Sequence, residues 1–508
     1  MAIGARMEFQ IGFGRQPRRR ERPEPDTPLR MLVCADLSGA AGAPGRPALR
    51  DRRALRADVD NLAQVLGRIA PRVALSGDGA PASVSIETID DFHPDQLFGR
   101  LAPFAHLRQL RVDLQDPARF ELAAAALGAA RAPSASRSPQ AGPAQADSPQ
   151  AAGESDFERL LGAPPAAIPA TPAAEPAPLE RWIRELVAPH VVPDTAGQMQ
   201  MLVDSVDAAV AGLMRKVLRD PALRRLEAAW RGVDWLVREL GGEASVEIHL
   251  FDANRDELLD DVRESASDLS RSAFGQLLCG PRTEGPDGEP WSLVVIDHAF
   301  GPGADDVLLL AALGGIASHA NAALLAGADP DLLGCPQVDA LGDAASWTGL
   351  DAGPAARWSA LRALDAAAWI ALAAPRVLLR RPYGRRSEPV EAFAFEEIVD
   401  PRDAAGYLWG SPAFALALLA GSAFREEGWT MDPEARLDLE DLPAFSYRDE
   451  DEPRLRVCAE ALVPERAGER MLEQGVMPLL GRRDRNALRL LRWQSIADPP
   501  QRLRGPWL

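Results

Sequence analysis

The sequence contains few of the residues that build metal centres and disulfide frameworks. Its four cysteines lie far apart without a CxxC pair, and its six histidines show neither HExxH nor HxH spacing. Zinc sites and small disulfide-bonded domains depend on such closely spaced side chains. We therefore predict no metal and no other cofactor, and the isolated cysteines fit a reducing cytoplasm.

Long apolar runs are also missing. The start, MAIGARMEFQIGFG, lacks the apolar core of a signal peptide. The longest apolar run, near residues 413–424, is well short of the roughly 18 residues that a membrane span needs. The sequence predicts neither export by a signal peptide nor membrane insertion.

Positive charge is scarce relative to negative charge. Lys and Arg number 56 against 74 Asp and Glu, which gives a formal net charge of −18. Phosphate groups would repel such a chain, so general binding to nucleic acid or to an anionic membrane is not expected. The basic cluster from Arg15 to Arg22 lies in a proline-flanked tail, and residues 1–26 are predicted to be disordered.

A Pro/Ala/Ser-rich stretch divides the chain. Residues 129–178 hold too few large apolar side chains to offset the entropy of ordering, which is typical of a flexible linker. We predict two folded units, residues 27–128 and 179–508, tethered in a one-to-one ratio. Within the linker, SDFERLLG groups Phe157, Leu160 and Leu161 as a candidate helical recognition motif, and a transient helix is an equally good interpretation.

Strand and helix patterns alternate in both units. In the first unit, residues 30–35 form an apolar strand candidate, 55–69 follow a helical pattern, 83–87 alternate as a strand with one wet face, and helices extend to 114. In the second, helices over 202–217 and 221–240 precede alternating strands and helices that begin at 246–251 and end near 488–494. Such alternation predicts an α/β fold (mixed α+β), with helices covering a sheet.

The helix predicted over residues 221–240 contains two tryptophans five residues apart. At about 100° per residue they lie on nearly opposite faces. One apolar stripe consists of Leu223, Leu226, Trp230, Val233, Val237 and Leu240. Trp230 is therefore predicted to be core, whereas Trp235 falls among charged residues. We interpret Trp235 as a candidate interface residue that another surface covers, with packing inside its own fold as the alternative.

Asp297 and His298 are the best candidates for catalysis. They end a buried-type strand that a glycine loop joins to a helix, which is where open α/β sheets place ligands. The loop lacks GxGxxG and GxxxxGK[ST], and the chain has no GxSxG elbow. An α/β enzyme using this loop remains an alternative, and it requires an activity that Asp297→Ala abolishes. Asp90, Asp91 and His93 could together hold a cation. A turn followed by a helix start is the better explanation of these residues.

Several longer motifs carry a resemblance to a known family. PLRMLVCADLSG (28–39) and SVSIETIDDFHPDQL (83–97) resemble the small sheath subunit of the bacterial type VI secretion system, called TssB, VipA or ImpB. LEAAWRGVDWLV, PWSLVVIDHAFGPGADDVLLL, YLWGSPAFALALLAGSAF and GVMPLLGRRDRNALRLLRWQSIADP resemble the large sheath subunit, called TssC, VipB or ImpC. The chain thus resembles both subunits joined in one polypeptide.

The resemblance implies a non-enzymatic, cytoplasmic structural protein. Sheath subunits pair, stack into a contractile helical tube around an inner tube, and are dismantled by an AAA+ unfoldase. A repeated interface that does not close on itself produces such a filament. The implied partners are other sheath subunits, the inner-tube protein, the baseplate and an unfoldase. In this family the segment that contains Asp297 and His298 is structural.

The chain departs from the family pattern in two places. The linker begins soon after Leu127, where small subunits continue into a long helix, and large subunits continue well past the segment that resembles QSIADP. The resemblance therefore implies a large subunit that is shortened at its C-terminus. This favours, as an alternative, an accessory, adaptor or cap protein that binds the sheath without polymerising.

Overall fold

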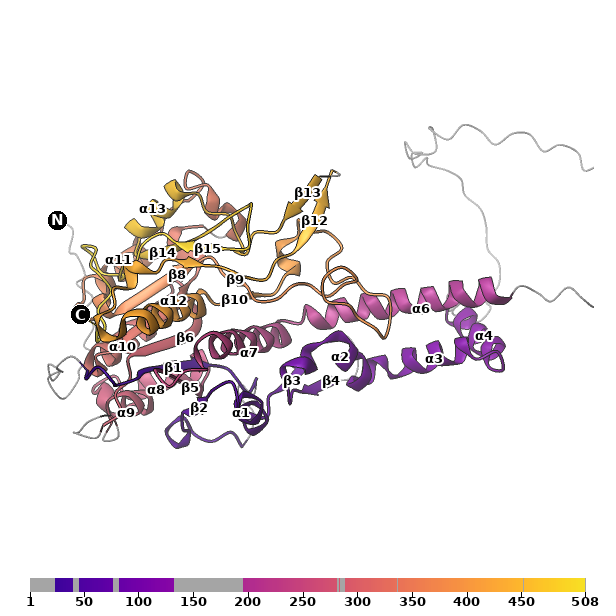
Figure 1. The fold of residues 1–508 in the computed structure, drawn as a ribbon, viewed down its shortest axis with the longest axis horizontal. Helices are drawn as coiled ribbons and strands as arrows, with labels where there is room; N and C mark the ends of the chain where they lie inside the picture. Colours follow the sequence, from indigo (N-terminus) through magenta and orange to yellow (C-terminus); the bar gives the residue numbers. More distant parts are fainter. Residues whose placement is uncertain are drawn as a thin grey trace, which may run out of the picture. The chain divides into compact units, whose positions relative to one another are not determined.

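The computed structural model describes residues 23–39, 45–75, 82–131, 195–280, 283, 288–335, 337–450 and 452–507 (Figure 1). The chain forms two compact units. The larger contains the described residues up to 107 and those from 207 onward, and the smaller contains those from 108 to 206. Each unit is described by itself.

A nine-stranded sheet forms the centre of the larger unit. Its strand order is β11-β15-β14-β8-β7-β6-β1-β5-β2. The strands are β1 (Leu29–Ala35), β2 (Leu55–Ala57), β5 (Val246–Asp252), β6 (Leu293–Phe300), β7 (Ala323–Ala328), β8 (Ile370–Ala374), β11 (Asp438–Leu439), β14 (Val476–Gly481) and β15 (Leu488–Leu490). The inner six are parallel, and β2, β15 and β11 are antiparallel to their neighbours. The mixed α/β fold is confirmed.

The strand β1 lies inside this sheet, although it belongs to the N-terminal segment of the chain. It pairs in parallel with β5 from Leu29 to Ala35 and with β6 from Met31 to Cys34. All seven of its residues are buried. The division into residues 27–128 and 179–508 stays a prediction, and the structure adds that a strand of the first range lies inside the sheet of the second. A strand that is apolar on both faces needs a neighbour on each side and a cover on each face.

Helices cover both faces of the sheet. On one face α10 (Ala304–Ala320), with α8 (Arg255–Glu264) and α9 (Ala273–Cys279), packs in a core that includes Leu32 and Cys34 of β1. On the other face lie α7 (Pro221–Leu240) and α12 (Pro412–Glu427). Gly421 of α12 lies so close to β1 that an added Cβ would be 2.8 Å from Cε of Met31. Alternate residues of β1 thus face two helical layers.

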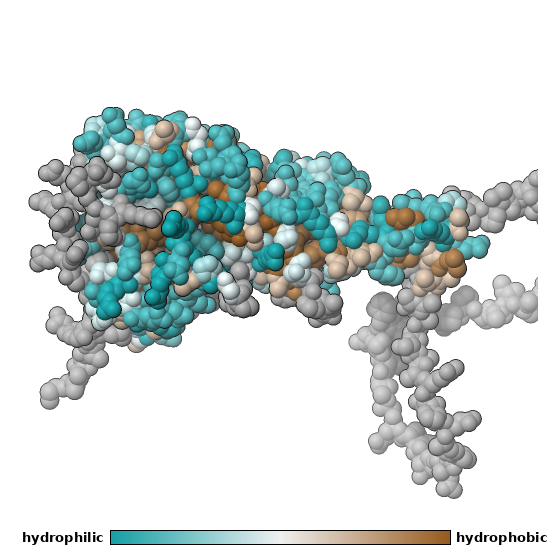
Figure 2. Space-filling view, turned by 90° about the horizontal axis from the view of Figure 1, so that it is seen from below, coloured by the Kyte–Doolittle hydropathy of each residue, from teal (hydrophilic) through white to brown (hydrophobic). Residues whose placement is uncertain are grey.

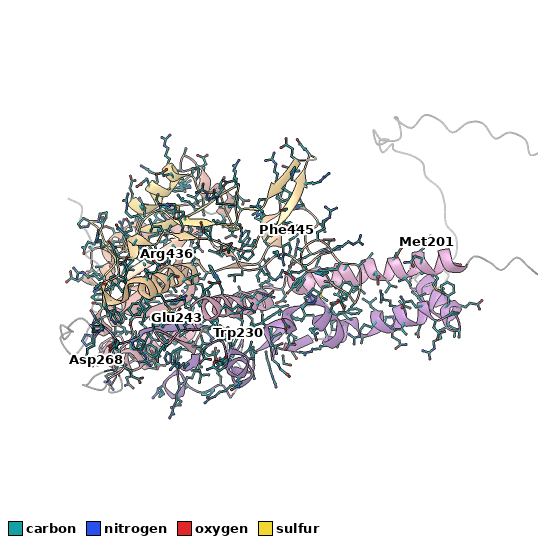
Figure 3. The ribbon with its side chains drawn as sticks, in the orientation of Figure 1. Met201, Trp230, Glu243, Asp268, Arg436 and Phe445 are labelled. Carbon is teal, nitrogen blue, oxygen red and sulfur yellow. The ribbon has the colours of Figure 1, made fainter. Side chains whose placement is uncertain are left out.

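The helix α7 forms where the sequence predicts it. Asp220 caps its N-terminus by accepting the N–H groups of Ala222 and Leu223, Pro221 occupies the first turn, and Gly241 follows its last residue. All six residues of the predicted stripe are buried, including Trp230 (Figure 3). Gly232 lets α12 approach, since a Cβ there would lie 2.4 Å from the ring of Phe414. The stripe prediction is confirmed.

Other segments of the larger unit surround this core. They are α1 (Leu62–Ile69), β3 (Arg72–Leu75), β4 (Ala82–Ser85), α2 (Pro94–Arg100), α11 (Ala352–Arg362), β9 (Val377–Leu378), β10 (Trp409–Gly410), β12 (Ser446–Asp449), β13 (Glu452–Leu455) and α13 (Glu465–Glu473). The helical prediction for residues 55–69 is wrong at its start, because β2 pairs with the edge of β5 there. His93 caps α2 by accepting the N–H of Asp95, which confirms the helix-start interpretation of this segment.

The smaller unit is helical. It contains most of α3 (Ala105–Gln115), α4 (Phe120–Arg131) and the first half of α6 (Thr195–Leu218). Leu114, Val203 and Val206 are buried in it. Val112, Leu122 and Met201 are 57%, 79% and 67% exposed, respectively. Among its described residues, each helix of this unit therefore leaves at least one large apolar side chain in solvent.

Candidate functional sites: a charged cleft and an intrachain junction

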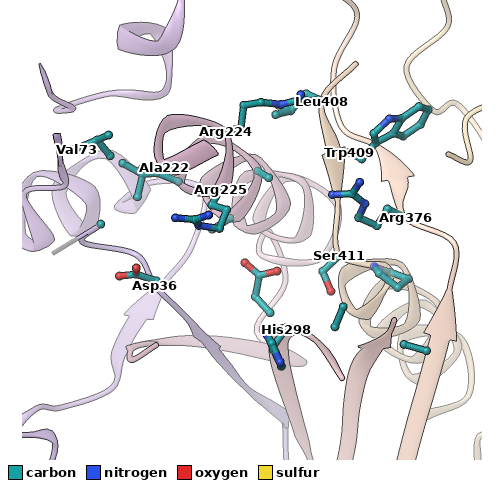
Figure 4. Close-up of a pocket in the computed structure, with 18 residues that line it drawn as sticks. Asp36, Val73, Ala222, Arg224, Arg225, His298, Arg376, Leu408, Trp409 and Ser411 are labelled. Carbon is teal, nitrogen blue, oxygen red and sulfur yellow. The ribbon is translucent and has the colours of Figure 1, made fainter. Parts of the chain in front are cut away.

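A cleft of about 430 Å³ opens at the carboxyl ends of the parallel strands (Figure 4). Asp36 follows β1, Asp297 and His298 lie in the carboxyl-terminal half of β6, and Ala328 ends β7. The opposite wall consists of the first turn of α7, with Arg224 and Arg225, and of Arg376, Trp409 and Ser411. Asp297 and His298, which the sequence singles out as candidates, therefore both line this cleft.

The two predicted residues have different electrostatic surroundings. Burial raises the pKa of Asp297 to about 6, opposed by His298 and reinforced by Asp36. His298 Nε2 lies 3.5 Å from Oδ1 of Asp306, the second acidic residue of α10. Although burial opposes it, hydrogen bonding by His298, Gly301 and Arg255 lowers the pKa of Asp306 to about 2. His298 Nε2 therefore faces an ionised carboxylate at a distance of 3.5 Å.

These residues do not form a nucleophile–base pair with any described neighbour in the cleft. Ser411 provides the only hydroxyl among the described lining residues, and it caps α12 by accepting the N–H of Ala413 at 3.3 Å. The part of the chain that the structure describes contains no group of three His, Cys, Asp or Glu side chains able to hold a metal ion. The cleft therefore presents charge, but its described side chains give covalent catalysis no support.

Replacing Asp297 by asparagine is expected to stabilise the protein at pH 7.5. The folded chain holds the proton of Asp297 up to about pH 6, whereas the unfolded chain releases it near its ordinary pKa of 3.8. Stability due to the neutral carboxyl is thus lost as pH rises through 6. The side chain is not fully sealed, so we expect Asp297→Asn to gain about 1–2 kcal/mol at pH 7.5 and almost nothing at pH 4.

Thermal unfolding at the two pH values measures this effect. The exposed Asp305, paired with Arg263 at 2.6 Å, provides the control variant Asp305→Asn, which should leave the midpoint unchanged. An equal gain at both pH values would show that the effect of Asp297→Asn does not come from ionisation.

A second feature is the extensive contact between the N-terminal segment, residues 23–107, and the rest of the larger unit. Arg30 of β1 pairs with Glu247 of β5 at 3.0 Å. Beyond the ends of β1 and β5, Arg46 lies 2.9 Å from Asp252, and Arg52 donates to Glu257 at 2.9 Å. Backbone N–H groups of Leu37 and Ser38 also donate to Asp252. Arginines of one segment thus neutralise carboxylates of the other.

Aromatic and capping contacts extend this junction. The indole of Trp230 donates to the carbonyl oxygen of Leu37 at 2.8 Å. The rings of His93 and Tyr383 meet edge to face with centroids 4.9 Å apart, and those of Phe98 and Phe393 lie equally close. The carboxylate of Asp95 accepts the N–H groups of residues 391 and 392.

A buried ion network adjoins these aromatic contacts. Glu227 of α7 is 1% exposed and accepts hydrogen bonds from Arg231 and Arg380, each at 2.7 Å. Arg380 also pairs with Glu397 at 2.7 Å, and its guanidinium lies 4.1 Å from the ring centre of Tyr383. The Tyr383 hydroxyl donates to the carbonyl of Phe92 at 3.5 Å. The network therefore connects α7 to the segment before α2.

Comparison with known families identifies both sides of this junction. Residues 200–497 match the family described as VipB: EvpB/VC_A0108, tail sheath N-terminal domain. The chain belongs to this VipB sheath family. Residues 18–120 match the family described as type VI secretion system, VipA, VC_A0107 or Hcp2. The resemblance to both sheath subunits is confirmed, and the VipA-type segment supplies β1 and β2 to the sheet of the VipB-type segment.

A curated relative agrees with this assignment. The chain is 26% identical over 314 residues to the type VI secretion system sheath protein TssC1 of Pseudomonas aeruginosa. The match covers 61% of this chain and 63% of the relative, so the chain spans less than two thirds of the length of that sheath protein.

The predicted interface residues have separate outcomes. Trp235 of the VipB-type segment is partly buried, so its role in an interface stays a prediction. Phe157, Leu160 and Leu161 lie outside the described residues. The sequence pattern did not single out Val112, Leu122 or Met201, which are exposed apolar side chains. Their positions off the main apolar stripes are the signal that could have identified them. Figure 2 colours the surface by hydropathy, with hydrophobic residues in brown.

In the described part of this VipB-family chain, no helix is long and apolar enough to cross a membrane. The apolar helix α12 is instead buried against β6, β7 and α7. Its apolar composition reflects contacts on several sides within the fold.

Proposed function

We propose that this chain is a structural component of a type VI secretion contractile sheath, with small- and large-subunit parts in one polypeptide. The observation that carries the proposal is that a VipA-type strand completes a VipB-type sheet. Because the two segments are joined, their ratio is fixed at one to one. The proposed location is the cytoplasm.

The proposed partners are other sheath subunits, the inner-tube protein, the baseplate and an AAA+ unfoldase. Trp235, Phe157, Leu160 and Leu161 are proposed contact residues for such assemblies. The membership of the chain in a tail sheath family supports contacts with other sheath subunits. The comparisons do not favour the enzyme that uses Asp297 and His298, since both matched families consist of type VI sheath proteins.

Electron microscopy of the full chain tests this proposal. The purified protein, alone and mixed with partner sheath subunits and inner-tube protein, is expected to form or join tubes visible by negative stain. Gold-labelled chain should then decorate the tube along its length. Label confined to one end would instead indicate the adaptor or cap, and chains that never join a tube would contradict both forms of the proposal.

A further inference from the structure

A second cavity, of about 260 Å³, lies beside α11, and its described lining residues are distinct from those of the cleft. One face of α11 lines it, because Ala355, Trp358, Ser359 and Arg362 fall at positions i, i+3, i+4 and i+7 of the helix. The rest of the lining comes from the chain around Leu332, from the segment that contains Trp347, and from the end of α13. The cavity therefore lies where a helix face meets two other parts of the fold.

The buried charge of this cavity is Arg362. It is 7% exposed, and its Nε donates to the carbonyl of Ile496 at 2.8 Å. No described residue forms an ion pair with Arg362, and its Nη1 and Nη2 groups donate to no described acceptor. These two groups are not sealed from water, since neither is among the buried polar atoms that lack a partner in the described part of the chain. The guanidinium therefore keeps two amino groups for a molecule in the cavity that Arg362 lines.

The surroundings of Arg362 balance its charge only in part. Burial lowers the pKa of Arg362, and the charge of Asp498 opposes this effect without forming an ion pair. Buried guanidinium groups in proteins usually have a paired anion. The backbone leaves room for the guanidinium, since Gly475 has a φ of +82° and a Cβ there would lie 3.2 Å from Nε. A carboxylate in the cavity would supply the missing partner.

Two tryptophans supply apolar surface to the same cavity. Trp358 precedes Arg362 by one turn of α11, and its indole N–H donates to the carbonyl of Gln474 at 3.1 Å. The indole N–H of Trp347 donates to the carbonyl of Ala340, also at 3.1 Å. Because both N–H groups are already bonded, the rings offer apolar surface to a molecule in the cavity. A bound molecule would thus meet a positive charge and two aromatic rings.

We propose that this cavity binds a carboxylate attached to an apolar body. The carboxylate accepts hydrogen bonds from Nη1 and Nη2 of Arg362, because the guanidinium fork matches paired carboxylate oxygens. The apolar body packs against Trp347 and Trp358, in the manner of pockets that combine apolar walls with a few placed polar groups. Arg470 at the rim is not required, since it pairs with Glu473 at 3.4 Å. A free monocarboxylate has this chemistry, and so does an acidic side chain beside an apolar residue of a polypeptide.

Calorimetric titration of the purified full chain with phenylacetate, at pH 7.5 and constant ionic strength, tests the proposal. Saturable one-to-one binding is expected. Phenylacetamide keeps the ring but has no charge, and acetate keeps the charge but has no ring, so each should bind at least about tenfold more weakly. A titration with the blocked dipeptide N-acetyl-Leu-Glu-amide distinguishes the two sources. Tighter binding than phenylacetate indicates a polypeptide, and weaker binding indicates a free carboxylate.

Two variants assign the binding to the named side chains. Arg362→Gln should reduce the affinity for phenylacetate to about that for phenylacetamide and leave phenylacetamide binding unchanged, which a merely structural role would not do. Trp347→Leu should weaken the binding of both compounds severalfold, and it provides the test if Arg362→Gln does not fold. The matched control is Arg466→Gln, which removes an exposed arginine of α13 that does not line the cavity.

The control variant should bind phenylacetate as the unaltered chain does. Absence of saturable binding, equal affinities for phenylacetate and phenylacetamide, or unchanged affinity in both the Arg362→Gln and Trp347→Leu variants would overturn the proposal. Because the titration uses unassembled protein, this result does not depend on whether the chain forms tubes.

Discussion

The substitution Val33→Asp is expected to prevent stable folding of the whole larger unit. Val33 is 0% exposed and lies in β1, between Leu250 of β5 and Val295 of β6. The change removes a buried apolar side chain and places a carboxylate in a sheet interior, at a combined cost of more than about 5 kcal/mol. We expect either no soluble protein on expression or no cooperative transition in a thermal unfolding measurement.

Val59→Asp is the matched control for this experiment. Val59 belongs to the same VipA-type segment but is 55% exposed, so the same chemical change should leave the unfolding midpoint within a degree or two. If Val33→Asp unfolded only the N-terminal segment and left a cooperative transition of residues 207–507, β1 would be an accessory strand. Because β1 lies inside the sheet, we expect both segments to unfold together in one transition.

The second large effect is expected for Glu227→Gln. This side chain is the shared acceptor of Arg231 and Arg380, and its removal leaves buried guanidinium charge with only Glu397 to balance it. Breaking a buried pair from one side typically costs about 3–5 kcal/mol. Chemical denaturation of the variant should show this loss with an unchanged slope, because the surface exposed on unfolding stays the same.

The pH dependence of the same network has a defined sign. Burial raises the pKa of Glu227, but Arg380 and Arg231 outweigh it, so the folded-state pKa lies below its ordinary value of 4.5. The stabilising contribution of the ionised Glu227 carboxylate is therefore present above pH 4.5, and it is lost as pH falls through the folded-state pKa. Glu243→Gln, at the exposed pair with Arg425, is the control and should not change stability measurably. Equal effects of the two variants would contradict a buried network.

Local features of the fold could be predicted from the sequence. The three- and four-residue spacing of Trp230 and its stripe, Asp220 before Pro221, and Gly241 after Leu240 all act within one helix, and all are confirmed. The strand at 30–35 was also predicted, but its neighbours were not. Its partners lie more than 200 residues away, and parallel pairing leaves no turn motif that reveals them.

The cleft could also be predicted only in part, because only some of its residues have a local signal in the sequence. Asp297 and His298 lie in the second half of β6, after its apolar run, so their position near a strand end could be predicted from the sequence. Asp36 follows β1 in the same way, in RMLVCADLSG, and this pattern could have identified it. Arg224 and Arg376 carry no such signal, because their place in the cleft depends on how α7 and β9 pack beside the sheet.

The outermost strands of the nine-stranded sheet, β2 and β11, have three and two residues. Each therefore leaves few unpaired backbone groups for a strand of another molecule. Many copies held side by side would have little chance of joining edge to edge through their main chains, which is the route to amyloid-like aggregation. At high local concentration, contacts between copies would therefore be formed by side chains. The specificity of those side chains would determine which surfaces meet.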